Sequence, residues 1–149
     1  MNKQENYQLL LEQAKSLLTG EHDLIANMSN INALLFSGLP NVSYAGFYRY
    51  QNGELILGPF QGPVACMHIA LGKGVCGTAA ATRQTQIVPD VHQFAGHIAC
   101  DAATNSEIVV PMVKNDQLIA VLDLDSNDFA IFDEVDAEYL AKIAALVIA

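Results

Sequence analysis

Apolar positions in the first quarter of the chain recur every three or four residues, the spacing of an amphipathic helix. The first such stretch places Tyr7, Leu10 and Leu18 on one face and ends near Gly20. The second opens near Asp23 and closes before Pro40. The pattern therefore predicts two N-terminal helices within about residues 4–37, each with one face to bury.

The pattern then changes to runs rich in aromatic and branched residues, which are typical of strands. The run 42–50 is followed by Asn52-Gly53, a hairpin-turn dipeptide, and by a second strand over 54–57. Two prolines and two glycines in 58–63 interrupt the pattern before a short strand over 66–69. These runs predict antiparallel pairing.

A small-residue helix over 78–82 and a short strand over 86–88 lead to two further strands, 108–113 and 118–125. Pro111 in the first of them indicates a sheet edge or a bulge. A last helix is expected over about 133–148, where Asp133 and Asp136 have capping-box spacing. We therefore predict an α+β fold in a single domain, 1–149. Its helices pack on a central antiparallel sheet of about six strands, and sheet and loops span 42–125.

Composition narrows the function. The 149 residues are 52% hydrophobic and 15% charged, as in a compact globular domain. A formal charge of -9 with only 7 Lys and Arg residues argues against a nucleic-acid partner. No apolar run has membrane-spanning length, and the polar start does not resemble a signal peptide, so we expect a cytoplasmic protein.

Cys100 is the candidate nucleophile. It lies in a loop, 90–107, that also carries His92, His97 and Glu107. Free cysteines are often simply buried, so the residues alone leave packing and catalysis both open. Zinc bound by the three cysteines and a histidine is a weaker alternative, because the chain has no C-x-x-C pair. We expect no metal.

Two carboxylates and two tyrosines form further candidate sites. Asp123 and Asp125 alternate with leucines, so both lie on one face of a strand end, where they could hold an ammonium group or share a proton. The alternative is a solvated strand end. Tyr44 and Tyr48 also share a face of their strand; strand aromatics are usually core, but one of them could line a pocket.

Several motifs together resemble the free methionine-(R)-sulfoxide reductases, which are stand-alone GAF-type domains. The resemblance runs from the first strand to the last helix, and the motif around Cys100 distinguishes this family from other GAF domains. The matching motifs are L-G-P-F-Q-G, A-C-M-H-I, G-K-G-V-C-G-T-A, G-H-I-A-C-D and V-L-D-L-D-S.

The resemblance implies reduction of free L-methionine (R)-S-oxide to L-methionine. Cys100 would attack the sulfoxide sulfur and become a sulfenic acid, Cys66 would resolve it to a disulfide, and Cys76 would assist or form an alternative disulfide. Thioredoxin would regenerate the thiols, with no bound cofactor; a homodimer is a further option. The alternative is a GAF-type module that senses a small ligand without catalysis.

The resemblance also assigns the substrate site. Glu107, Asp123 and Asp125 match acidic site residues, which would protonate the sulfoxide oxygen and hold the substrate ammonium. Tyr44 and Tyr48 would form an aromatic wall. The family commonly has tryptophan where this chain has Tyr44, and this chain contains no tryptophan at all. The substrate methyl group therefore meets a different surface here.

Overall fold

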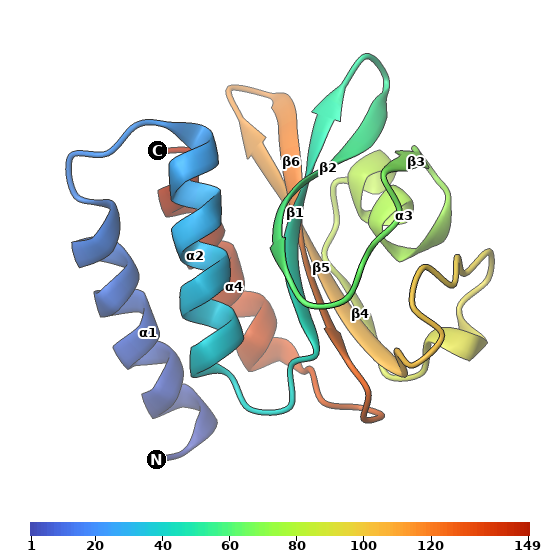
Figure 1. Ribbon diagram of the computed structural model, residues 1–149, viewed down its shortest axis with the longest axis horizontal. Coiled ribbons are helices and arrows are strands. Elements are labelled where there is room, and N and C mark those ends of the chain that lie inside the picture. The colour runs from blue at the N-terminus through green and yellow to red at the C-terminus, as the bar shows by residue number, and fades with distance from the viewer.

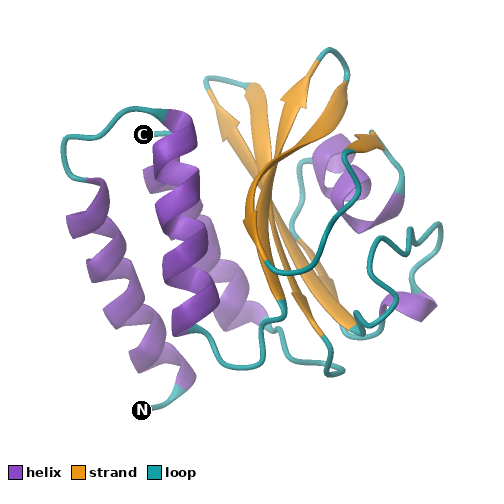
Figure 2. Cartoon of the chain, in the orientation of Figure 1, coloured by secondary structure: helices purple, strands orange, loops and turns teal.

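The computed structural model describes all of residues 1–149 and consists of helices on both faces of one six-stranded sheet (Figures 1 and 2). The helices are α1 (Lys3–Leu18), α2 (Leu24–Gly38), α3 (Gly74–Thr82) and α4 (Glu134–Val147). The strands are β1 (Tyr44–Gln51), β2 (Glu54–Gln61), β3 (His68–Ala70), β4 (Gln86–Val88), β5 (Ser106–Lys114) and β6 (Gln117–Ser126). The predicted fold class is confirmed.

All strand pairs are antiparallel, in the order β3-β2-β1-β6-β5-β4. Figure 1 shows α1, α2 and α4 on one face of the sheet and α3, with the long loops, on the other. Because side chains alternate along a strand, each strand serves two cores. Phe47 and Leu122 belong to the larger core under the three helices, whereas Tyr48 and Val109 belong to a smaller core under α3.

The helix ends follow the sequence signals. Asp133 caps α4, and its side chain and that of Asp136 form the expected capping box. Asp136 also accepts hydrogen bonds from Tyr7 Oη and Lys3 Nζ, at 2.5 and 2.7 Å, which connect α1 to α4. None of the helices has the length and apolar character needed to cross a bilayer.

Strand β2 is longer than predicted and continues through Gly58 and Pro59. Gly46 of β1 is opposite Phe60 and Tyr48 is opposite Leu57, so the pairing shifts register there. Such a bulge leaves a residue unpaired, which accommodates a proline that has no N–H to donate. The expectation of a break at residue 58 was therefore wrong.

Helix α3 starts at Gly74 instead of residue 78, and β3 starts at His68 instead of residue 66. Gly77 lies in the first turn of α3, where the helix packs closely against the end of β3. A Cβ at Gly77 would lie 2.5 Å from the Ala70 carbonyl oxygen. Pro111 lies beyond the end of β4, which pairs only with Glu107–Val109, and a register shift follows at Met112. The side of Pro111 that faces β4 is therefore unpaired, in agreement with the prediction of an edge or a bulge.

Candidate active site

A pocket lies between the sheet and the N-terminal end of α3, under the loops that carry Cys66 and Cys100. Its cavity volume is about 50 Å³, room for a few water molecules and far below the ~300 Å³ of a typical ligand pocket. The lining residues are Tyr44, Tyr48, Pro63, Val64, Ala65, Ile69, Lys73, Gly74, Val75, Cys76, His97, Ile98, Cys100, Asp101, Thr104, Glu107, Asp123 and Asp125. The structure thus brings every predicted site residue except Cys66 to the pocket lining, and Cys66 is bonded to Cys100.

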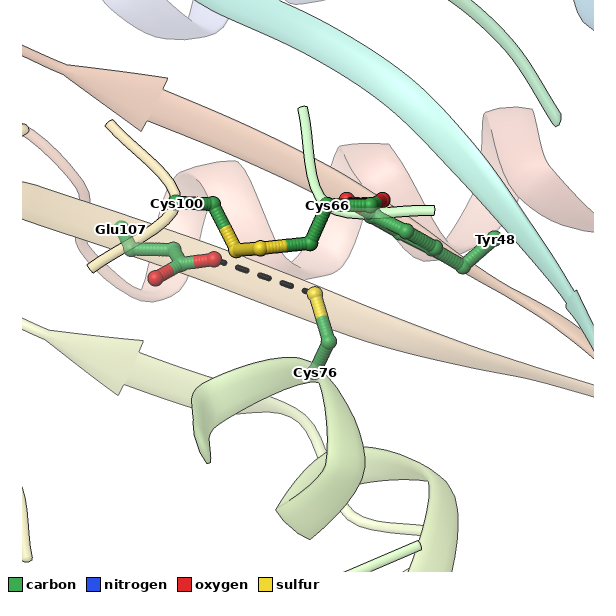
Figure 3. The surroundings of a disulfide bond; sticks show 5 residues. All are labelled: Tyr48, Cys66, Cys76, Cys100 and Glu107. Atoms are coloured by element: carbon green, nitrogen blue, oxygen red, sulfur yellow. Dashed lines mark hydrogen bonds between the residues drawn. A yellow bond between two sulfur atoms is a disulfide. The ribbon is translucent and has the colours of Figure 1, made fainter. Parts of the chain in front are cut away.

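Cys66 and Cys100 form a disulfide across the pocket, with their Cα atoms 5.4 Å apart (Figure 3). Cys66 lies in the loop between β2 and β3, and Cys100 in the loop before β5. Tyr48 Oη donates a hydrogen bond of 2.9 Å to the Cys66 carbonyl oxygen and so holds one of the two loops to the sheet. The fold therefore brings the two cysteines together from two separate loops.

Cys76 is the one free thiol and is buried in the first turn of α3. Its Sγ lies 3.9 Å from Glu107 Oε2, the contact drawn in Figure 3. Burial, and then the nearby carboxylates of Asp123 and Glu107, raise the pKa of this thiol well above its usual value. Cys76 is therefore a neutral thiol and a weak nucleophile in this state.

The three carboxyl groups come from two neighbouring strands. Glu107 of β5 is directly opposite Asp125 of β6, and Asp123 lies two residues before Asp125 on the same face. Burial, and then the charge of Asp123, raises the pKa of Glu107 and of Asp125 well above the ordinary range. At Asp123 burial also raises the pKa, but interactions with Glu107 and Asp125 oppose the rise. Burial thus favours protonated carboxyl groups at Glu107 and Asp125, and it favours the protonated form less strongly at Asp123.

Tyr44 and Tyr48 both face the pocket from β1, as their shared strand face predicted. The Tyr44 ring stacks on Phe60 with centroids 5.5 Å apart, and it lies over Gly46, where a Cβ would come within 2.5 Å of Tyr44 Oη. The Tyr44 hydroxyl is buried without a hydrogen-bond partner. Burial, and then the charge of Asp123, raises the pKa of both tyrosines, so both phenols are neutral.

The opposite wall of the pocket is electropositive. Lys73 is the N-cap residue of α3, and its side chain makes no capping hydrogen bond. The pocket is lined there by Lys73, Gly74, Val75 and Cys76. The first N–H groups of a helix have no partners within the helix and carry a partial positive charge. The pocket therefore has an acidic side formed by β5 and β6 and a positive side formed by α3.

The two histidines of the loop have different positions. His92 Nδ1 lies 2.8 Å from Asp90 Oδ1 at the surface. His97 lines the pocket, and its Nδ1 is buried without a partner. Burial, and then His92, lower the pKa of His97, which favours the neutral ring. His68 is exposed and pairs with Glu54 at 2.9 Å, so it is a surface residue.

Thr104, Lys73 and the apolar lining of the pocket were not predicted from the sequence. Thr104 Oγ1 is another buried polar atom without a partner in the pocket wall. A correct prediction of the start of α3 would have placed Lys73 at its N-cap and so identified it as a candidate pocket residue. The zinc alternative required all three cysteines as ligands, and here two of them are bonded to each other.

The chain matches the GAF domain family over residues 33–148. It is 48% identical to the free methionine-R-sulfoxide reductase of Escherichia coli over 97% of this chain and 88% of the relative. A solved structure of fRMsr of Staphylococcus aureus in its reduced form is 53% identical, with a TM-score of 0.94 over 97% of this chain and 96% of that one.

A second solved structure is the free methionine-R-sulfoxide reductase from Neisseria meningitidis in complex with its substrate. It is 41% identical, with a TM-score of 0.96 over 99% of this chain and 89% of that one. Fold, motifs and identity agree over nearly the full length of both chains. The chain belongs to the GAF domain family and, within it, to the free methionine-R-sulfoxide reductases.

Proposed function

We propose that this protein reduces free L-methionine (R)-S-oxide to L-methionine. The observation that carries the proposal is the disulfide between Cys66 and Cys100, which lies against a pocket with three buried carboxyl groups. A disulfide is what a completed reduction would leave behind, and carboxylic acids are what the sulfoxide oxygen would need. It is this pairing of redox-active thiols with acids that favours an enzyme over a ligand sensor.

The reaction begins from the reduced protein. The Cys100 thiolate attacks the sulfoxide sulfur while a carboxylic acid of the cluster protonates the sulfoxide oxygen. The oxygen is transferred to Cys100, which becomes a sulfenic acid, and methionine leaves. The Cys66 thiol then attacks the Cys100 sulfur, water is lost and the disulfide forms. Two thiols are oxidised for each sulfoxide reduced.

The cluster can divide its tasks by protonation state. Glu107 and Asp125, whose pKa values burial raises most, are suited to donate the proton. Asp123 is suited to hold the substrate ammonium, since its Oδ1 is buried without a partner. The positive end of α3 and Lys73 would receive the substrate carboxylate. A free amino acid matches both sides of the pocket, whereas a peptide-bound methionine lacks both charges.

The electrons would come from a dithiol protein, thioredoxin, which would reduce the disulfide without any bound cofactor. That requirement fits a cytoplasmic protein, where thioredoxin keeps thiols reduced. We also propose a homodimer, because Leu9, Leu17 and Ile25 are exposed on α1 and α2. Sedimentation of the purified protein at several concentrations tests the homodimer.

The experiment couples the protein to thioredoxin, thioredoxin reductase and NADPH. Free methionine (R)-sulfoxide should cause NADPH consumption, and neither the (S) isomer nor an N-acetylated peptide should do so. Cys100→Ser should abolish consumption. Cys66→Ser should release one equivalent of methionine per site and then stop turning over. A Cys100→Ser variant that keeps its rate would refute the mechanism.

A further inference from the structure

The proposed cycle uses Cys66 and Cys100 and leaves Cys76 without a required role. Its Sγ, a Glu107 carboxylate oxygen and an Asp123 carboxylate oxygen all lie within 4.8 Å of one another. The three residues are 5%, 8% and 4% exposed, so the cluster is almost completely buried. We propose that these three side chains form an inhibitory site for Zn²⁺ or a similar borderline-soft divalent cation, which displaces the substrate ammonium.

The geometry is close to that of a tetrahedral zinc site. Zinc binds thiolate sulfur at about 2.3 Å and carboxylate oxygen at about 2.0–2.2 Å, which places neighbouring ligand atoms roughly 3.3–3.7 Å apart. Cys76 Sγ and Glu107 Oε2 are already 3.9 Å apart. The three residues come from α3, β5 and β6, all in contact with one another, so small side-chain rotations suffice to close the site.

A second observation points to a ligand at the same place. Asp123 Oδ1 and Tyr44 Oη are buried and have no hydrogen-bond partner, and both residues line the pocket beside the cluster. Asp123 and Tyr44 are each 4% exposed, so solvent does not satisfy these atoms. Buried polar atoms are normally paired, and a bound cation with its water would pair them.

The chemistry of the donors sets the class of cation. A thiolate together with carboxylates suits Zn²⁺ or Co²⁺, whereas Mg²⁺ and Ca²⁺ take oxygen ligands alone. Binding must displace the Cys76 proton, so affinity should rise with pH. Cys76 stays free while Cys66 and Cys100 are bonded to each other. The proposed site can therefore form in the oxidised protein, whereas a site built from all three thiols could not.

Cobalt tests the site directly, because thiolate–Co²⁺ bonds absorb in the near ultraviolet and tetrahedral Co²⁺ absorbs strongly in the visible. The oxidised protein, in which Cys76 is the sole thiol, should develop both absorptions, saturate at one Co²⁺ per chain and lose them when Zn²⁺ is added. Co²⁺ binding without the sulfur band would overturn the proposal, since it would place the ion on oxygen ligands alone.

Two variants test the ligands, and a third is the matched control. Cys76→Ser should lose the sulfur band and bind Zn²⁺ at least ~10-fold more weakly, and Asp123→Asn should weaken Zn²⁺ to a similar extent. Glu54→Gln removes a carboxylate from the exposed pair with His68 and should leave both measurements unchanged. A Cys76→Ser variant that is folded by circular dichroism and binds Zn²⁺ normally would overturn the site.

The competition with substrate rests on the proposed function. Methionine, which carries the same ammonium, should raise the apparent dissociation constant of Co²⁺ for a Cys66→Ser, Cys100→Ser double variant, in which Cys76 is again the sole thiol and no disulfide closes the pocket. Zn²⁺ affinity that does not respond to methionine would overturn the inhibitory role. Reductase turnover, measured in a buffer that contains a metal chelator, tests the proposed function separately. A protein that gives the normal cobalt band but shows no turnover would refute the reductase and leave the metal site standing.

Discussion

Reducing the Cys66–Cys100 disulfide should destabilise the folded protein by a predictable amount. The two cysteines are 34 positions apart, so the bond closes a loop of that size in the unfolded chain. The chain-entropy relation for such a loop gives a loss of about 4 kcal/mol at 25 °C when the bond is broken. For a domain of this length, that corresponds to a fall in Tm of roughly 10 °C.

The assay is urea unfolding of the oxidised protein and of the protein in excess dithiothreitol, followed by circular dichroism, with m fitted separately because the bond also makes the unfolded chain more compact. Cys100→Ser should have the stability of the reduced protein in both buffers. Cys76→Ser should retain the full difference, since Cys76 lies outside the bond.

The result also bears on the redox cycle. By linkage, a bond that stabilises the fold by about 4 kcal/mol is itself favoured about 10³-fold in the folded protein over the unfolded chain. Oxidised and reduced proteins that unfold with the same free energy would refute the reasoning, because the disulfide would then not restrict the unfolded chain.

Three further predictions follow from single side chains. Burial raises the pKa of Glu107, so the folded state holds protons that the unfolded state loses. The free energy of unfolding should therefore fall as pH rises from about 5 to 7, by about 1.4 kcal/mol per unit for each extra proton. Glu107→Gln should flatten this slope in urea titrations and Glu54→Gln should not. Tyr44→Phe removes a buried hydroxyl without a partner; it should stabilise the protein by about 1 kcal/mol in urea and raise KM for the sulfoxide. Gly77→Ala places a Cβ 2.5 Å from the Ala70 carbonyl oxygen and should cost about 1–3 kcal/mol; a variant as stable as the parent would contradict that contact.

Elements with strong local signals were predictable from the sequence. The helix stripes of α1 and α2, the Asn52-Gly53 turn and the Asp133 capping box each depend on residues close together in the chain, and each is present in the structure. The alternation that places Asp123 and Asp125 on one strand face is equally local, and so is the shared face of Tyr44 and Tyr48.

Features that depend on contacts across the fold were not predictable. Helix α3 starts at Gly74, which has a φ of 63°, and a Cβ at Gly77 would lie 2.5 Å from the carbonyl oxygen of Ala70 in β3. The continuation of β2 past Pro59 depends on a bulge opposite β1. The start of α3 in turn decides that Cys76 and Lys73 reach the pocket, which is why spacing alone could not place the third thiol.

The small volume of the pocket has a kinetic consequence. While the Cys66–Cys100 bond is closed, the remaining cavity of about 50 Å³ cannot admit a second amino acid. The sulfoxide and the reducing dithiol must then bind alternately, so that each binds only after the other has reacted and dissociated. Initial-rate plots against one substrate, at several fixed concentrations of the other, should give parallel lines, as in a double-displacement scheme.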